Sequence, residues 1–465
     1  MSKKILILLP DGVSLRNYAY TSFYSLGIEK GYDVVFWNAT PFDLNSLGFS
    51  SIDIQNPKPH WLTDIQKVAC KNIELYLFSK RNNDPIYYSY AFPLRYSSVK
   101  EFIKSSLIKF FTKWYVSEKG LLKLRNNMRR RERKTRYYQD CLNTLKSEKP
   151  DLVFCTSQRS IISVAPLTAS QDLGIPTVAF IFSWDNVPKA TTVVTTDYYF
   201  VWSEHMKQEL IHYQKYIEPE QIKVTGTPQF ENHFNSSVKE TREVFFKTHG
   251  LDLNKEYICF SGDDVTTSPT DDFYLRDLAA AVKALNDNGQ NLGIIFRRCP
   301  VDFSERYNTV LKVYEDIIVS IQPAWEKIGD SWSTILPTKE DLALQTNIIA
   351  HTACVVNLGS SMVFDYACYD KPCAFVNYNY LNPSKQAEEG VYVYDYVHFR
   401  SMPSKKAVVW LSDPEDIGNN LLAMLAEEKE TLAESKKWFE KINLHPPQDA
   451  SERIWDAIEK LGIND

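Results

Sequence analysis

The sequence predicts an α/β protein with two domains, each built on a parallel sheet covered by helices. Short, continuous apolar runs, typical of strands buried on both faces, alternate along the chain with stretches of helical length. The alternation falls into two series, separated by a polar stretch at residues 231–240. A chain of 465 residues is long enough for two or three domains, each with its own core.

The first series opens with the run KILILLP, a helix that ends near Gly31, and a second strand. It resumes after a long interval and continues through four more strands. The expected strands are residues 4–10, 32–38, 150–157, 175–186, 197–204 and 222–230. This strand–helix–strand order is the beginning of a doubly wound sheet. The unit lacks GxGxxG, so we do not expect a dinucleotide site.

The second series has strands expected at residues 256–264, 292–300, 332–338, 353–359 and 371–378. Helices are expected between them at residues 271–289, 339–352 and 360–370, and an amphipathic helix at 449–462. We therefore place a first domain at residues 1–235, a second at 236–445, and a closing helical segment at 446–465.

Composition excludes several classes of protein. The net charge of −5 is not that of a nucleic-acid-binding protein. The eight cysteines include no CxxC pair, so we expect free thiols and no zinc site. No apolar stretch approaches the roughly 18 residues of a membrane span, and the first apolar run stops at Pro10. We expect a cytoplasmic protein with no bound cofactor.

A basic segment at residues 95–136 interrupts the first series, and we expect a helical insertion at about 95–137. It holds fourteen Lys and Arg against three Glu, which leaves a local charge of about +11. Residues 99–115 have helical spacing, with lysines beside an apolar face formed by Phe102, Ile103, Leu107, Phe110 and Phe111. Three interpretations remain open: contact with an anionic membrane, a solvated insertion packed on the domain, or a groove for an anionic acceptor.

Two serines stand where a strand is expected to become a helix. Gly359 allows a ligand to approach the backbone, and Ser360 and Ser361 offer hydroxyls and N–H groups at a helix start. This combination suits a phosphate. An ordinary serine helix cap is the alternative, and for this stretch alone it is the more common case.

Two further loops are expected at the same sheet edge. Arg297 and Arg298 end a strand, so one guanidinium is expected to point toward a site there, although a pair of surface arginines is the alternative. The loop at residues 260–270 offers hydroxyls and a flexible Gly262. Ligands of open α/β sheets bind at this edge.

At this point the sequence resembles GT-B glycosyltransferases, which have two Rossmann-like domains that face a central cleft and a last helix that crosses back. Its motifs are similar to those of bacterial polysialyltransferases, capsule Kdo transferases and teichoic-acid CDP-glycerol transferases. Those families hold the donor phosphate with Arg-x-His-Pro and Ser-Ser elements; here RRCP stands at 297–300 and GSSMVFDYACYDKP at 359–372. Cys299 replaces the His, so Arg297 or Arg298 takes that role or the donor differs.

The first domain carries weaker parts of the resemblance. PDG at residues 10–12 is a partial match to the acidic element that holds the catalytic base of polysialyltransferase-like enzymes. The Trp-Asp-Asn loop at 184–186 and the Val-Trp-x-Glu strand end at 201–204 are similar to bacterial sugar-transferase-like proteins.

The resemblance implies a donor site on the second domain and a catalytic base on the first. The donor-binding residues expected are Ser261, Gly262, Thr266, Thr267, Arg297, Arg298, Thr338, Gly359, Ser360, Ser361 and Met362. Asp11 and Asp185 are the candidate bases, each with a turn or cap role as the alternative. Glu204 and His205 are further candidates, for which a helix-start role is favoured.

The expected function is transfer of a sugar from a UDP-, GDP- or CMP-sugar to a hydroxyl of a glycan or lipid-linked glycan, with inversion. The sequence has no Asp-x-Asp and no HxxxH, so we expect no obligatory metal ion. Two alternatives stay open: a CDP-alcohol glycerophosphotransferase-like enzyme, and a nucleotide-binding module without catalysis. A peripheral position on the inner face of the cell membrane is also expected if the basic segment binds lipid.

Overall fold

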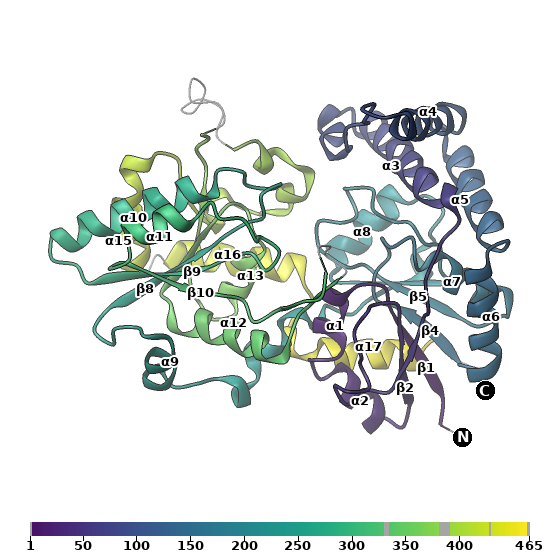
Figure 1. The fold of residues 1–465 in the computed structure, drawn as a ribbon, viewed down its shortest axis with the longest axis horizontal. Coiled ribbons are helices and arrows are strands. Elements are labelled where there is room, and N and C mark those ends of the chain that lie inside the picture. The colour runs from purple at the N-terminus through teal and green to yellow at the C-terminus, as the bar shows by residue number, and fades with distance from the viewer. Residues whose placement is uncertain (1, 330–333, 381–390, 427–428, 463–465) are drawn as a thin grey trace.

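The protein has two α/β halves that lie side by side, each with its own parallel sheet (Figure 1). The computed structural model describes residues 2–329, 334–380, 391–426 and 429–462. The predicted fold class is therefore confirmed. The exact limits proposed for the domains, 1–235, 236–445 and 446–465, stay a prediction.

The first sheet has seven parallel strands in the order β3-β2-β1-β4-β5-β6-β7. The interior strand β1 is buried from Ile5 to Leu9, because helices cover both sides of a continuous apolar run. The strands are β1 Lys4–Leu9, β2 Asp33–Asn38, β3 Ser51–Asp53, β4 Leu152–Cys155, β5 Thr177–Phe180, β6 Tyr198–Val201 and β7 Ile222–Val224. The edge strand β3 was not predicted.

The second sheet has six parallel strands in the order β10-β9-β8-β13-β14-β15. They are β8 Glu256–Ser261, β9 Leu292–Arg297, β10 Ile318–Ile321, β13 Cys354–Asn357, β14 Cys373–Val376 and β15 Val409–Leu411. Both edge strands, β10 and β15, were missed by the sequence analysis.

One predicted strand lies outside this sheet. Residues 332–338 were expected to form a strand; within them Ile335–Leu336 forms β12, which pairs antiparallel with β11, Glu326–Lys327. The two form a separate ribbon that reaches the first half near Gly12, where an added Cβ would lie 2.8 Å from the Ile335 carbonyl oxygen.

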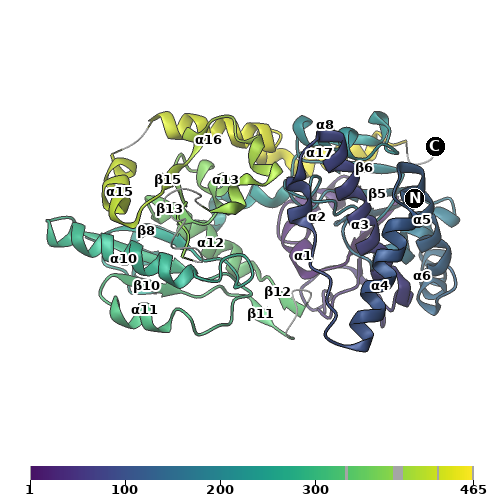
Figure 2. The same ribbon diagram turned by 90° about the horizontal axis from the view of Figure 1, so that it is seen from above.

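Helices surround both sheets (Figure 2). Those of the first half are α1 Gly12–Tyr18, α2 Phe23–Glu29, α3 Trp61–Asn82, α4 Val99–Trp114, α5 Glu118–Glu132, α6 Arg136–Glu148, α7 Val164–Asp172 and α8 Glu204–Tyr213. The later ones are α9 Arg242–His249, α10 Asp271–Asp287, α11 Asn308–Val313, α12 Lys339–His351, α13 Met362–Ala367, α15 Ile417–Leu425, α16 Lys429–Ile442 and α17 Ala450–Glu459.

The basic segment forms α4, α5 and the start of α6. With α3, helices α4 and α5 build a bundle at the upper right of Figure 1, joined by a small apolar core of its own. Ile108 and Phe111 of α4 are buried in this core, so Phe111 does not share an exposed face with Phe102 and Phe110 as the sequence suggested. Among the described helices, none is both long and apolar enough to cross a membrane.

The last helix, α17, returns to the first half of the chain, as predicted. The Trp455 ring stacks on Phe23 and Tyr32 at centroid distances of 4.9 and 5.0 Å, and its Nε1 donates to the Phe23 carbonyl oxygen at 2.8 Å. Gly27 leaves the space for this ring, since an added Cβ would overlap the indole. An ion pair of 2.7 Å between Lys30 and Asp456 lies beside it. The helix therefore completes the core of the first half.

Trp455→Ala should destabilise the protein by roughly 3–5 kcal/mol, because it leaves a cavity between α17 and α2. Urea unfolding followed by circular dichroism measures the change. Trp61→Ala is the control: Trp61 is 67% exposed, and its loss should cost less than about 1 kcal/mol. Equal unfolding curves for Trp455→Ala and the parent would contradict the role given to α17.

Candidate functional site

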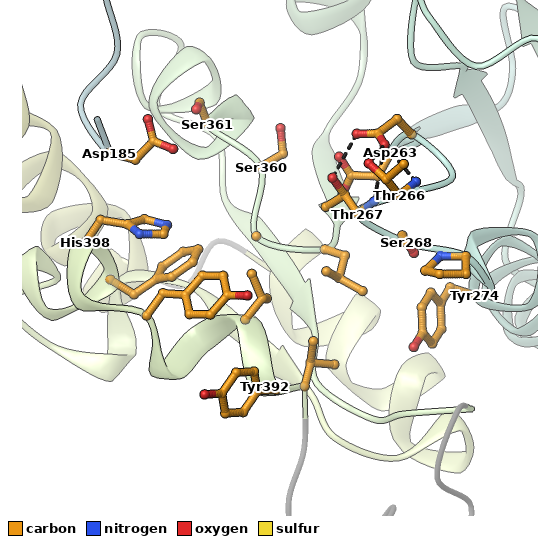
Figure 3. Close-up of a pocket in the computed structure, with 18 of the residues that line it drawn as sticks. Asp185, Asp263, Thr266, Thr267, Ser268, Tyr274, Ser360, Ser361, Tyr392 and His398 are labelled. Carbon is orange, nitrogen blue, oxygen red and sulfur yellow. Dashed lines mark hydrogen bonds between the residues drawn. The ribbon is translucent and has the colours of Figure 1, made fainter. Parts of the chain in front are cut away.

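A cavity of about 740 Å³ lies between the two halves, and we call it the central cavity (Figure 3). The loop after β5 supplies Trp184, Asp185 and Lys189 from the first half. The second half supplies the loop after β8, residues 358–361 after β13, and residues 391–399. The cavity is thus built at the carboxyl ends of parallel strands from both sheets, where open α/β sheets bind ligands.

The two serines line this cavity. Gly359 before them has φ +71°, and an added Cβ would lie 3.0 Å from the Phe399 ring, so only glycine suits the turn. The Ser361 hydroxyl accepts a hydrogen bond of 3.1 Å from Trp184 Nε1 of the first half. Ser361 makes no side-chain cap bond to α13, and the Met362 N–H reaches Ser360 Oγ only at 3.4 Å. Simple helix capping is therefore a weak explanation of this pair.

The predicted arginine clamp is not assembled at the cavity. Arg297 is buried and forms an ion pair of 2.8 Å with Asp341, which also accepts from Trp325 Nε1 at 2.6 Å. Arg298 donates to the Ser304 carbonyl oxygen at 2.6 Å, and its guanidinium lies over the Tyr307 ring. Both side chains already have partners elsewhere, and neither lines the cavity.

Thr266 and Thr267 do line the cavity, but they face inward on their own loop. Both hydroxyls donate to the Asp264 carboxylate, the Thr267 bond being 2.8 Å. Burial alone would raise the pKa of Asp264, yet these bonds hold it below the usual value. The two hydroxyl protons are thus used within the loop and are not offered to a phosphate.

Four other predicted donor residues lie outside the lining of the central cavity. Thr338 caps α12 by accepting from the Asp341 N–H at 3.1 Å. Met362 is buried against Gln345. Ser261 is the last residue of β8, and the Gly262 N–H donates to the Arg297 carbonyl oxygen at 2.9 Å.

Asp185 forms an ion pair with Lys189 and accepts from Asn186 Nδ2 at 2.9 Å. Burial would raise the pKa of Asp185, but the charge of Lys189, joined in acid by that of His398, outweighs burial and holds the pKa of this carboxyl well below its usual value. His398, 5% exposed, meets the Tyr90 hydroxyl through Nδ1 at 3.2 Å. Burial, and then the charge of Lys189, lower the pKa of His398 to about 3. The imidazole is therefore neutral at physiological pH.

A second cavity of about 690 Å³ adjoins the first and lies wholly in the first half. Asp185 and Lys189 line both cavities. Asp11 lines only the second, and its Oδ1 accepts from the N–H and the hydroxyl of Ser14, each at 3.0 Å. Asp11 thus holds the start of α1 while facing this cavity.

The remaining candidates have structural positions. Ser203 caps α8, and Glu204 begins that helix. His205 lies 3.6 Å from Glu209 on the same helix. Neither Glu204 nor His205 lines either of the two cavities.

Several lining residues were missed by the sequence analysis. Asp263 has one carboxyl oxygen that is buried without a partner in the described structure, and burial together with Asp271 raises its pKa well above the usual value. Lys189 is the only Lys or Arg among the described lining residues of the central cavity. Asp263 belongs to the pair of adjacent aspartates in the predicted loop at residues 260–270, and that pair was the local feature of the sequence that could have indicated it as a site residue.

The fold recurs in solved structures at low sequence identity. S. aureus MnaA, in a structure with UDP, has a TM-score of 0.55 and 12% identity, with 99% of this chain and 98% of that chain covered. The UDP-GlcNAc 2-epimerase of Methanocaldococcus jannaschii has a TM-score of 0.51 and 13% identity, with 99% of this chain and 100% of that chain covered. A glycosyltransferase from Rickettsia africae has a TM-score of 0.53 and 9% identity, with 100% of both chains covered. No family model and no curated protein sequence matches the chain.

These similarities extend over both halves, the cleft between them and the returning helix. The chain therefore has the GT-B architecture that the sequence analysis expected. At these identities the likeness concerns the fold alone.

His398→Asn should weaken the pH dependence of stability. The folded-state pKa of His398, about 3, lies below its unfolded value of 6.5, so the unfolded state takes up the proton first and stability is lost as pH falls from 6.5 toward 3. A single proton gives a slope of at most about 1.4 kcal/mol per pH unit. Urea unfolding midpoints measured from pH 7 to 4 should fall more steeply for the parent than for the variant; parallel curves would show that His398 does not titrate this way.

Proposed function

We propose that the protein is a glycosyltransferase that moves a sugar from a nucleotide sugar to a hydroxyl of a surface glycan. The observation that carries the proposal is the central cavity, where Ser360 and Ser361 of one half and Asp185 and Lys189 of the other share one lining. Hydroxyl donors and a cation near the leaving group, with a carboxylate near the acceptor, are what this transfer requires.

The donor would lie against the second half. The hydroxyls of Ser360 and Ser361, with Lys189, would bind the diphosphate; α13 has six residues, so its dipole adds little. The Asp264 carboxylate suits a hydroxyl of ribose or sugar, since carboxylates accept hydrogen bonds, and the Asp263 carboxyl adds a buried oxygen without a partner in the described structure. Aromatic rings for stacking are supplied by Tyr274, Tyr392, Tyr396 and Phe399.

The reaction is a direct displacement at the anomeric carbon. The acceptor oxygen forms a bond to that carbon as the bond to the diphosphate oxygen breaks, and the electron pair leaves on the phosphate. The acceptor proton passes to a carboxylate, either Asp185 or Asp11. This route inverts the anomeric configuration and assigns no metal ion.

Asp185 lies at the junction of the two cavities, which favours it as the base over Asp11. Its ion pair with Lys189 makes it a weak base in the free protein. A donor phosphate that draws Lys189 away would remove the attraction that lowers the pKa of Asp185. Its basicity would then rise only when the donor is bound.

The motif similarity to polysialyltransferases, Kdo transferases and CDP-glycerol transferases supports a surface-glycan product. It now rests on the Ser-Ser element, because Arg297 and Arg298 lie outside the cavity. The specific family therefore stays a proposal.

The exposed side of α4 supports a peripheral membrane position. Five large apolar side chains on this side are 52–78% exposed: Val99, Phe102, Ile103, Phe110 and Trp114. Exposed lysines flank them on both sides of the helix: Lys100, Lys104, Lys109 and Lys113. An apolar stripe between cations matches the acyl boundary and the charge of an anionic lipid surface. We propose that α4 binds the inner face of the cell membrane and brings the enzyme to a lipid-linked acceptor.

Incubation with a panel of UDP-, GDP- and CMP-sugars tests the activity. A bound donor at 100 times its dissociation constant stabilises the folded state by about 2.7 kcal/mol, which a thermal-shift measurement detects. Sugar transfer to a glycan acceptor supports the proposal. A phosphodiester product from CDP-glycerol, epimerisation of UDP-GlcNAc without acceptor, or nucleotide binding without turnover would each replace it.

Ser361→Ala should weaken binding of the donor nucleotide by about 1–3 kcal/mol, the range for a hydrogen bond to a charged group. Asp185→Asn should not weaken that affinity, because it frees Lys189 for the phosphate, and it should remove turnover. Calorimetry and a transfer assay separate the two effects, with Ser237→Ala on the exposed surface as the control. If Ser361→Ala binds nucleotide like the parent and only melts earlier, Ser361 links Trp184 to α13 and does not contact the donor.

Vesicle flotation tests the membrane surface. The protein should float with vesicles that contain phosphatidylserine and less with phosphatidylcholine alone, and Phe110→Ser/Trp114→Ser should abolish the difference. Val244→Ser/Leu253→Ser removes two side chains that are 53% and 52% exposed in the second half, and should bind like the parent. Equal flotation of both double variants would show that α4 is not the docking surface.

A further inference from the structure

The second cavity is lined by more basic than acidic side chains. It is bounded by α3, α5 and the loops that follow β4 and β5. Four acidic side chains line it, and each is already engaged. Glu74 pairs with Arg125 at 2.8 Å, both 2% exposed, and Asp64 pairs with Lys104 at 2.6 Å.

The other two acidic groups are also occupied. Asp185 pairs with Lys189, and Asp11 accepts two hydrogen bonds from Ser14. Three of the four carboxylates in this wall thus have a cationic partner, and the fourth, Asp11, accepts from the neutral Ser14.

Three basic side chains of the cavity have no carboxylate partner in the described structure: Lys67, Lys71 and Arg159. Lys71 lies over the Phe92 ring at 4.6 Å, and Arg159 over the Phe182 ring at 4.0 Å. Burial, and then the charges of Lys189 and Lys67, lower the pKa of Lys71 to about 8. All three side chains are half-buried, and half-buried cations that lie close together are stabilised by an anion that enters between them.

The same cavity offers an apolar wall, formed by Val68, Met128, Ile162 and Val193. A free inorganic ion makes no favourable contact with an apolar wall, whereas a larger molecule with an anionic group can pack its apolar part against it. Asp185 and Lys189, shared with the central cavity, place this molecule next to the proposed reaction centre.

We propose that the second cavity is the acceptor site and that Lys67, Lys71 and Arg159 select an acceptor that carries a negative charge beside its reacting hydroxyl. The charge is a carboxylate of an acidic sugar or a phosphate that joins the glycan to a lipid. That the bound molecule is an acceptor rests on the proposed function. The anion site itself is argued from the lining of the cavity and does not depend on that function.

Calorimetry on the full chain without nucleotide tests the site independently of donor binding. The probes are 3′-sialyllactose, geranyl diphosphate and lactose. At least one anionic probe should bind at least about tenfold more tightly than lactose, as expected for charge-assisted contacts. Tight binding of sialyllactose would identify the anionic group of the acceptor as the carboxylate of an acidic sugar. Tight binding of geranyl diphosphate would identify it as a lipid phosphate. Equal affinity for all three, or no binding, overturns the proposal even if a donor binds elsewhere.

Variants give a second, sharper readout. Lys71→Gln and Arg159→Gln should each lower the affinity for the anionic probe about tenfold, while Lys123→Gln, exposed on α5, should not change it. Parent affinity should fall as pH rises from 7 to 9, because Lys71 loses its proton near pH 8. Lys71→Arg stays charged and should keep its affinity at pH 9. A parent and a Lys71→Arg variant with the same pH profile would show that Lys71 does not hold the anion, whatever the effect on folding.

Discussion

Trp184 joins the two halves of the molecule at the central cavity. Its Nε1 donates to Ser361 across the cleft at 3.1 Å, and its ring packs edge-on against Phe364, Phe399 and Trp438 of the second half. Because Asp185 is the next residue in the chain, these contacts hold it in the lining that it shares with the two serines.

The loop after β5 also connects the two cavities. Lys189, four residues beyond Asp185, forms an ion pair with it, so each group compensates the charge of the other. A ligand that binds Lys189 from either side changes the environment of Asp185. In the proposed reaction, a charged group on one substrate would thereby change the basicity of the carboxylate that meets the other.

The central strands could be predicted because an apolar run buried on both faces is a local property of the sequence. The edge strands β3, β10 and β15 could not, because they are short and half-buried. Arg297 was assigned to the site from its place at a strand end, yet its partner Asp341 comes from α12, 44 residues later. His398 and Lys71 have no local motif at all; only the fold brings them to their cavities.

Helix α17 makes the first half discontinuous in sequence: its core needs residues from both ends of the chain. During synthesis, the ribosome completes β7 and then the whole second half before Trp455 emerges. At usual translation rates this interval lasts on the order of ten to fifty seconds. Through that time the rings of Phe23 and Tyr32 lack their partner, so the nascent chain offers chaperones an apolar surface that the finished protein conceals.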